Sequence, residues 1–169
     1  PSGMINGVMS LVQLTRLSTL QNPLVPIECW EIEDSPLYAW RGFMLDEARH
    51  FWGMKKVKQI LNWMALYKLN RFHWYLTDTQ EEIKEIVTYA LERNIHIIPE
   101  IDMPGHASAA SKAYPEFSGG GSPKYPGYTF NPGKDSVYTY LTDILKEVDA
   151  LFPSQVIHLG GDEVHYGNQ

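Results

Sequence analysis

The residues best placed to do chemistry are two adjacent acids, Asp162 and Glu163. The segment before them, residues 156–161, reads Val-Ile-His-Leu-Gly-Gly. Its apolar part is typical of a strand that is covered on both faces, and the glycines let the backbone turn or approach a ligand closely. Neighbouring side chains in a strand point to opposite faces, so adjacent acids can serve one site only where the strand ends. The sequence therefore predicts that this pair lies at the mouth of an active site.

Three other strand-like segments also end in an acid. Asp46 closes the segment that starts at residue 40, Asp78 the one that starts at 71, and Asp102 the one that starts at 96. An isolated Asp-Glu pair is usually a solvated turn, because charged residues are mostly exposed. Four apolar segments that each end in an acid indicate instead that the acids gather in one constellation.

Helical patterns separate these strand-like segments. The residues 54–67, 79–93 and 136–151 each place apolar side chains on one stripe, and residues 9–20 form a fourth candidate helix. Thr79 and Glu82 fit a capping box, which marks the start of a helix. Residues 104–132 hold three consecutive glycines and several prolines, and we predict a mobile surface loop there. Alternating strands and helices with short links indicate a parallel sheet.

The predicted fold is therefore α/β, of the (β/α) TIM-barrel type, because barrel enzymes keep their chemistry at the carboxyl ends of the strands. We expect one catalytic-type domain over residues 1–169, with strands near 40–46, 71–78, 96–102 and 156–162. A complete barrel takes about 250 residues. Four βα units make a half-barrel or truncated barrel, and a half-barrel exposes two sheet edges.

Composition excludes several classes of function. The chain has 14 basic and 20 acidic residues, a net charge of −6, and no basic cluster. Nucleic acid and anionic membrane surfaces are therefore poor partners. Cys29 is the single cysteine, which rules out an internal disulfide and a cysteine-based zinc site. No apolar run approaches the roughly 18 residues of a membrane helix.

Four motifs follow one another along the chain. They are Arg41-Gly42-x-x-Leu45-Asp46-x-x-Arg49-His50-Phe51, Phe72-His73-Trp74-Tyr75-Leu76-Thr77-Asp78, Pro99-Glu100-Ile101-Asp102-Met103-Pro104-Gly105-His106, and His158-Leu159-Gly160-Gly161-Asp162-Glu163. In this order they resemble the motifs of glycoside hydrolase family 20, the β-N-acetylhexosaminidases, and the likeness runs from about Met4 to the end of the chain.

The resemblance implies removal of a terminal β-linked N-acetylglucosamine or N-acetylgalactosamine by substrate-assisted catalysis, with retention of configuration and an oxazolinium intermediate. Glu163 would protonate the leaving oxygen and later deprotonate water, while Asp162 would stay ionised and orient the acetamido N–H. Arg41 would bind sugar hydroxyls with its five-donor fork. Asp102 and His106 would form a relay that tunes Glu163.

The family pattern also sets expectations for supporting groups and partners. Asp46 and Asp78 would hold the strand ends together, and neither a cofactor nor a metal is expected. The family's fifth to eighth strands are absent, together with the tryptophans that wall its sugar pocket. We expect N-acetylhexosamine-terminated glycans as substrates, a homodimer that closes the half-barrel, and a secreted or periplasmic location.

Alternative interpretations stay open. The chain could be a non-catalytic glycan-binding fragment, or a metal-dependent hydrolase whose ligands come from His50, Asp78, Asp102, His106, Asp162, Glu163 and His165. Arg41 could instead form a structural ion pair with Asp46. His165 lies two residues past Glu163, and it would either support the acid pair or be exposed to solvent.

Overall fold

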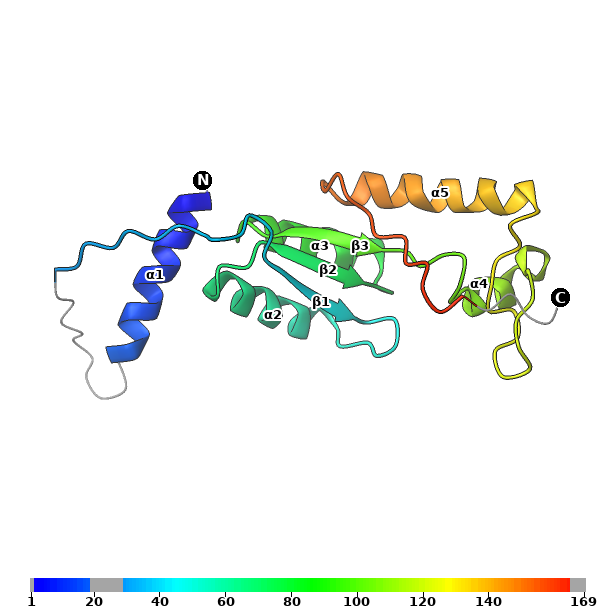
Figure 1. Cartoon of the computed structure of the whole chain (residues 1–169), viewed down its shortest axis with the longest axis horizontal. Helices are drawn as coiled ribbons and strands as arrows, with labels where there is room; N and C mark the ends of the chain where they lie inside the picture. Colours follow the sequence, from blue (N-terminus) through cyan, green and yellow to red (C-terminus); the bar gives the residue numbers. More distant parts are fainter. Residues whose placement is uncertain (1, 19–28, 165–169) are drawn as a thin grey trace. The chain divides into compact units, whose positions relative to one another are not determined.

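The computed structural model describes residues 2–18 and 29–164. Strands and helices alternate through the first part of the chain, and helices follow the last strand (Figure 1). The order is α1 (Ser2–Ser18), β1 (Gly42–Asp46), α2 (Met54–Leu66), β2 (Arg71–Tyr75), α3 (Gln80–Leu91), β3 (His96–Glu100), α4 (Ser108–Ala113), the short 3₁₀ helix η1 (Pro115–Phe117) and α5 (Asp135–Leu151). The three strands form one sheet in the order β1-β2-β3.

Helices α2 and α3 form where the apolar stripes predict them, and they pack against each other. The inward stripe of α2 includes the buried residues Val57 and Leu61, and that of α3 includes Ile83 and Ile86. The predicted capping box is confirmed. The Thr79 hydroxyl accepts a bond from the Glu82 backbone N–H, and the Glu82 carboxylate accepts one from the Thr79 backbone N–H. Two of the donors that a helix start leaves open are thereby satisfied.

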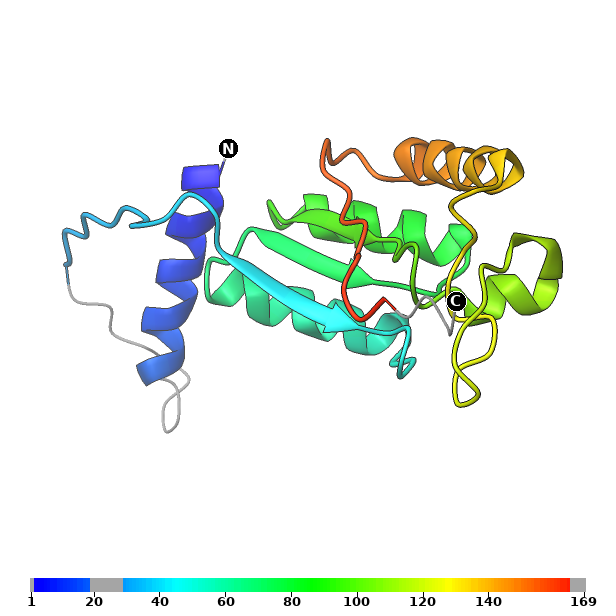
Figure 2. The same cartoon turned by 45° about the vertical axis from the view of Figure 1, so that its right-hand side comes forward.

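The sheet is parallel, because each helical crossover brings the chain back to start the next strand at the same end (Figure 1). Figure 2 shows the arrows of β1 and β2 running the same way from a second side. Along β2 the side chains alternate between buried and half-buried, with Phe72 and Trp74 fully buried. Such alternation leaves Arg71, His73 and Tyr75 on the opposite face.

The fourth expected strand, near 156–162, is shorter than predicted. It contributes a single parallel bridge, between His158 and Glu100. Three backbone hydrogen bonds make the pairing: His158 N–H donates to the Pro99 carbonyl, Ile101 N–H to His158, and Met103 N–H to Leu159. Regular pairing stops there because Gly160 and Gly161 take positive φ values of 65° and 100°, which a strand does not contain.

The segment predicted as an irregular loop, residues 104–132, holds α4 and η1 and packs on α5. Its core is a cluster of Ala107, Phe130 and Val137, all buried. Two backbone bonds join distant parts of the segment, since Ala107 N–H donates to the Tyr128 carbonyl and Phe130 N–H to the Pro104 carbonyl. The predicted surface loop is therefore largely irregular but also holds two short helices and a small apolar core. Aromatic side chains in the segment supply an apolar core that the glycine and proline count does not reveal.

Contacts divide the chain into two compact units. The first unit holds residues 1–73 and 77–97, and the second holds 74–76 and 98–169. The division falls inside strands β2 and β3 and so does not coincide with a linker. A single catalytic-type domain over 1–169 stays a prediction. Among the described residues, no helix is long and apolar enough to span a membrane.

Candidate active site

The second unit gathers most of the predicted site residues around one turn, residues 160–163. Four residues of this neighbourhood have left-handed backbone: Gly160 and Gly161, and also His106 with φ 53° and Glu163 with φ 51°. A non-glycine residue in this region is uncommon and strained, and such strain concentrates at functional sites. The two strained non-glycine residues here are the candidate acid and the candidate relay histidine.

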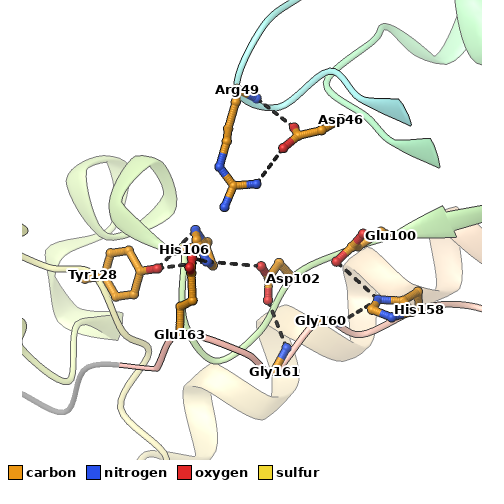
Figure 3. A network of polar contacts seen from close by, with 10 residues as sticks. All are labelled: Asp46, Arg49, Glu100, Asp102, His106, Tyr128, His158, Gly160, Gly161 and Glu163. Atoms are coloured by element: carbon orange, nitrogen blue, oxygen red, sulfur yellow. Dashed lines mark hydrogen bonds and ion pairs between the residues drawn. The ribbon is translucent and has the colours of Figure 1, made fainter. Parts of the chain in front are cut away.

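Asp102, His106 and Glu163 form a line of polar contacts (Figure 3). His106 Nε2 lies 3.6 Å from the Asp102 Oδ2 and 3.5 Å from the Glu163 Oε2. The Asp102 side chain is 4% exposed and that of His106 16%, whereas that of Glu163 is 63% exposed. The buried end of this line can hold a proton on the imidazole, while the exposed end can give a proton to a ligand. The structure thus brings these three predicted residues together.

The Asp102 carboxylate also ties the turn to the end of β3. Its Oδ1 accepts a hydrogen bond of 3.1 Å from the Gly161 backbone N–H. A residue at the strand end therefore fixes the backbone that carries Asp162 and Glu163. Asp162 itself is exposed on this turn, as expected for a group that meets a ligand rather than the core.

Tyr128 is part of this neighbourhood, and sequence reasoning missed it. Its hydroxyl oxygen lies 2.8 Å from His106 Nε2 and 3.1 Å from Nδ1. The two rings are 4.9 Å apart between centroids. No motif pointed to Tyr128, because it lies 22 residues beyond His106 in a segment without periodicity.

Glu100 and His158 form a second pair that the sequence did not indicate. His158 Nδ1 lies 3.2 Å from Glu100 Oε1 and accepts a hydrogen bond of 3.1 Å from the Gly160 N–H. Glu100 is buried, whereas the His158 side chain is 48% exposed. His158 therefore has polar partners on both sides of its ring nitrogen Nδ1. It helps to hold the start of the glycine turn.

Three of the seven candidate metal ligands converge among the described residues. Ligand atoms of Asp102, His106 and Asp162 lie within 4.8 Å of one another. His50, in the first unit, stacks edge-on against Trp52 with centroids 4.5 Å apart. His165 lies outside the described residues. The cluster coincides with the acid pair and its relay.

In the first unit, Asp46 pairs with Arg49 directly after β1. The Asp46 carboxylate accepts a bond of 2.9 Å from the Arg49 backbone N–H and lies 2.5 Å from the guanidinium Nη1. Burial raises the pKa of Asp46, but the hydrogen bonds and the positive charge of Arg49 outweigh it, so the pKa is below the ordinary value. The alternative of an ion pair between Arg41 and Asp46 is therefore wrong, since Arg49 takes that place.

Arg41 lies at the amino end of the first strand. It precedes β1, which begins at Gly42. Its Nε donates to the Lys68 carbonyl at 2.8 Å and its Nη1 to the Tyr38 carbonyl at 2.6 Å. A barrel enzyme keeps its chemistry at the carboxyl ends of the strands. The Arg41 guanidinium is thus engaged by backbone carbonyls near the amino end of β1, and its substrate-binding role stays a prediction.

Asp78 is a buried acid next to a second one. Both of its carboxylate oxygens are buried and lack a hydrogen-bond partner among the described residues. Glu47, 1% exposed, accepts bonds from the backbone N–H groups of Trp52 and Gly53. Burial, and then repulsion from Glu47, raise the pKa of Asp78 to about 6. Sequence reasoning did not single out Glu47.

The model of the glycosyl hydrolase family 20 catalytic domain matches residues 38–81 and 79–168 of this chain. The two matches meet where Asp78 runs directly into α3. A β-hexosaminidase of Vibrio furnissii is 37% identical over 98% of this chain and 35% of its own length. A chitooligosaccharidolytic β-N-acetylglucosaminidase of Bombyx mori is 33% identical over 96% of this chain and 33% of its own. The chain thus spans about a third of the length of these relatives.

Solved structures that resemble this chain are also β-N-acetylhexosaminidases and β-N-acetylglucosaminidases. A β-N-acetylhexosaminidase of Bacteroides fragilis superimposes with a TM-score of 0.85 at 36% identity, over 96% of this chain and 39% of that one. An exo-β-N-acetylglucosaminidase of Vibrio harveyi, solved in complex with N-acetylglucosamine, also superimposes with a TM-score of 0.85, at 31% identity, over 96% of this chain and 33% of that one. The predicted fold class, part of a (β/α) TIM-type barrel, is confirmed.

Proposed function

This chain belongs to glycosyl hydrolase family 20, and from that premise we propose that it carries the catalytic acid pair of a retaining β-N-acetylhexosaminidase. The proposed substrates are glycans that end in β-linked N-acetylglucosamine or N-acetylgalactosamine. The observation that carries the proposal is the line from buried Asp102 through His106 to exposed Glu163, whose imidazole–carboxylate contacts are 3.6 and 3.5 Å.

In the proposed reaction the substrate supplies its own nucleophile. The acetamido oxygen attacks the anomeric carbon while Glu163 gives its proton to the glycosidic oxygen, and the bond to the leaving group breaks. The product of this step is an oxazolinium ion. Glu163, now a carboxylate, takes a proton from water, which attacks the anomeric carbon and restores the acetamido group with retained configuration.

Asp162, the neighbour of Glu163 in the chain, and His106, 3.5 Å from its carboxylate, would both assist Glu163. The Asp162 carboxylate would accept the acetamido N–H and stabilise the positive charge that grows on the oxazolinium ring. His106 lies beside the buried Asp102. The charge on Glu163 would change the proton affinity of His106 as Glu163 passes from acid to base. The left-handed backbone at His106 and Glu163 supports this assignment, because such strain is characteristic of functional positions.

Arg49 is a second candidate, beside Arg41, for binding sugar hydroxyls. It follows the carboxyl end of β1, and its side chain is 58% exposed. The Asp46 carboxylate holds one side of the guanidinium, which leaves further N–H donors for hydroxyl oxygens. Asp46 would then orient Arg49.

The decisive experiment is hydrolysis of p-nitrophenyl N-acetyl-β-glucosaminide by the purified chain and by Glu163→Gln. We expect turnover in the parent and its loss in the variant. Glu31→Gln, the same chemical change at an exposed position, is the matched control and should retain activity. Equal signals in all three proteins would identify a contaminant and defeat the assignment of Glu163.

The second candidate function is glycan binding without turnover. It is favoured by the fact that the chain spans 35% of the Vibrio furnissii relative and 33% of the Bombyx mori one. A folded parent that binds N-acetylglucosamine in a calorimeter but releases no p-nitrophenol would support this candidate. Binding that is lost in Asp162→Asn would place the ligand on the acid pair.

We also propose that a second copy of the chain covers the free edge of the sheet. Among the described strands, β1 pairs only with β2. Beside it an apolar groove of about 590 Å³ is lined by Phe43, Trp52, Trp63 and Tyr67 among others. The ring of Trp63 is 49% exposed. Open strand edges and exposed apolar patches both favour association.

Sedimentation equilibrium tests this association. We expect a dimer for the parent and a monomer for Trp63→Glu, which puts a charge in the groove. Leu37→Glu changes a side chain that is 86% exposed and lies outside the groove, and it should leave the dimer intact. A parent that sediments as a monomer at all concentrations would contradict the proposal.

A further inference from the structure

Tyr128 makes the shortest polar contact to the His106 ring, and it belongs to none of the four motifs. Its hydroxyl oxygen is 2.8 Å from Nε2, whereas the two carboxylates lie 3.6 and 3.5 Å from the same nitrogen. At 2.8 Å from Nε2 and 3.1 Å from Nδ1, the hydroxyl oxygen lies within hydrogen-bond distance of both ring nitrogens, whereas the carboxylate contacts are at or beyond that distance. The hydroxyl therefore competes directly with Asp102 and Glu163 for the imidazole proton.

The backbone around Tyr128 is built to hold this side chain against the His106 turn. Ala107 N–H donates to the Tyr128 carbonyl at 2.8 Å, and Phe130 N–H donates to the Pro104 carbonyl at 2.9 Å. These two bonds join Tyr128 itself and Phe130 to Ala107 and Pro104, which lie on either side of His106 in the chain. The ring is 8% exposed and lies 4.9 Å from the imidazole between centroids. Its position is therefore fixed by packing and by hydrogen bonds.

The backbone of Gly105 lies close to the Tyr128 ring. A Cβ built at Gly105 would lie 3.4 Å from Tyr128 Cε1, which is already close contact. His106 follows with its strained φ of 53°. A strained residue persists only when its surroundings over-determine it, and the Tyr128 hydroxyl and ring supply two of those constraints on His106.

A tyrosine hydroxyl suits this role chemically. It carries one donor and acceptor lone pairs, so it can meet the ring nitrogen whether that nitrogen is protonated or bare. When Nε2 carries the proton, the hydroxyl oxygen accepts a hydrogen bond from this N–H, which then points away from Glu163. When Nε2 is bare, the hydroxyl donates to it, and the proton on Nδ1 no longer faces the acid.

We propose that Tyr128 is a positioning residue of this site, which holds the plane of the His106 ring and selects the tautomer that His106 presents to Glu163. The proposal rests on the function proposed above for Glu163. It extends that function to a residue in the segment after β3, whose side chain contacts His106 and acts on the acid only through it.

The test is Tyr128→Phe, which removes the hydroxyl and keeps the ring. Tyr138→Phe is the matched control, since its hydroxyl, donating to the Pro132 carbonyl, belongs to the same unit but is not bonded to His106. Long-range ¹H–¹⁵N spectra report the tautomers of the histidines, and His106→Gln assigns the His106 signals. We expect Tyr128→Phe to change the His106 nitrogen shifts, and Tyr138→Phe to leave them unchanged.

The kinetic readout is separate from the spectroscopic one. With p-nitrophenyl N-acetyl-β-glucosaminide, we expect kcat of Tyr128→Phe to fall about tenfold, the size of one lost hydrogen bond, with KM unchanged and the pH profile of kcat displaced. Unchanged nitrogen shifts with an unchanged pH profile would overturn the proposal and leave Tyr128 as packing only. A parent without turnover would defeat the proposed function, while the nitrogen shifts would still decide the role of Tyr128.

A measurement on the unmodified chain guards against a variant that does not fold. Ring-to-ring nuclear Overhauser effects between Tyr128 and His106 are expected in the parent, because the ring centroids are 4.9 Å apart. Their absence in the folded parent would contradict the contact on which the proposal stands.

Discussion

The carboxylate of Asp102 occupies the space in which residue 160 would carry a side chain. A Cβ built at Gly160 would overlap the Asp102 Oδ1 and approach its Cα to 3.0 Å. The same carboxylate accepts the N–H of Gly161. The glycine pair is therefore required by the acid at the end of β3, in addition to the turn it makes. The position of Glu163 depends on that fit.

Gly160→Ala is expected to lose activity and stability together. An alanine here must adopt a φ of 65° and displace Asp102. Gly120→Ala is the matched control, because Gly120 has a φ of 103° but open space where a Cβ would go. The control should lose about 1–2 kcal/mol of unfolding free energy, the cost of left-handed backbone. Thermal melts should show a clearly larger loss for Gly160→Ala, and equal losses would mean that Asp102 moves aside freely.

Asp102→Asn is expected to slow the chemical step while preserving the fold. The amide oxygen can still accept the Gly161 N–H, but it no longer offers a negative charge to His106. We expect kcat to fall by roughly 10- to 100-fold, corresponding to about 1.4–2.8 kcal/mol in the barrier, with little change in KM. Asp143→Asn, which breaks an exposed pair with Lys146, is the control. A rise in KM alone would assign Asp102 to substrate binding instead.

The buried acid Asp78 should make the protein less stable as the pH rises. Its pKa is about 6 in the folded chain against an ordinary 3.8, so between these values the folded state binds more protons than the unfolded state. The free energy of unfolding therefore falls as pH rises through this window and stays low above it, by up to about 3 kcal/mol. Chemical denaturation of the parent and Asp78→Asn between pH 4 and pH 8 measures this contribution.

The Asp78 prediction has its own control. We expect Asp78→Asn to be about 1–2 kcal/mol more stable than the parent near pH 7.5, with no advantage near pH 4. Glu47→Gln keeps an oxygen for the backbone N–H groups of Trp52 and Gly53 but removes the charge beside Asp78. It should make the loss of stability smaller and end it at a lower pH, because the Asp78 pKa falls toward its ordinary value when the Glu47 charge is removed. Parallel stability curves for the parent and Asp78→Asn would refute the assignment.

Arg41 and Arg49 should give opposite phenotypes. Arg49→Met removes the exposed guanidinium at the carboxyl end of β1, and we expect KM to rise about tenfold with a small change in melting temperature, because exposed ion pairs contribute about 0–1 kcal/mol. Arg41→Met removes charged donors from the carbonyls of Lys68 and Tyr38. It should lower the melting temperature and leave KM unchanged. A raised KM in Arg41→Met would support the substrate-binding role predicted for Arg41.

Much of the fold follows from local patterns. The apolar periods of α2 and α3, the Thr79–Glu82 capping box and the acid after each strand are properties of neighbouring residues, which interact the same way before and after folding. The candidate pair Asp162 and Glu163 was predicted for the same reason, because two glycines and a strand end are visible in six consecutive residues. The relay through Asp102 and His106 came from the family resemblance, and its contact geometry came from the tertiary structure.

Other features depend on contacts between residues far apart in the chain. Arg41 and Arg49 lie in one motif, and only the start of β1 at Gly42 shows which of them follows the carboxyl end of the strand. The pKa of Asp78 depends on burial and on Glu47 in another element, and the contact between Tyr128 and His106 depends on two backbone bonds that span more than 20 residues. Sequence alone determined which groups could do the chemistry. The tertiary structure decided which of them touch, because distance, burial and charge arise only when distant segments pack together.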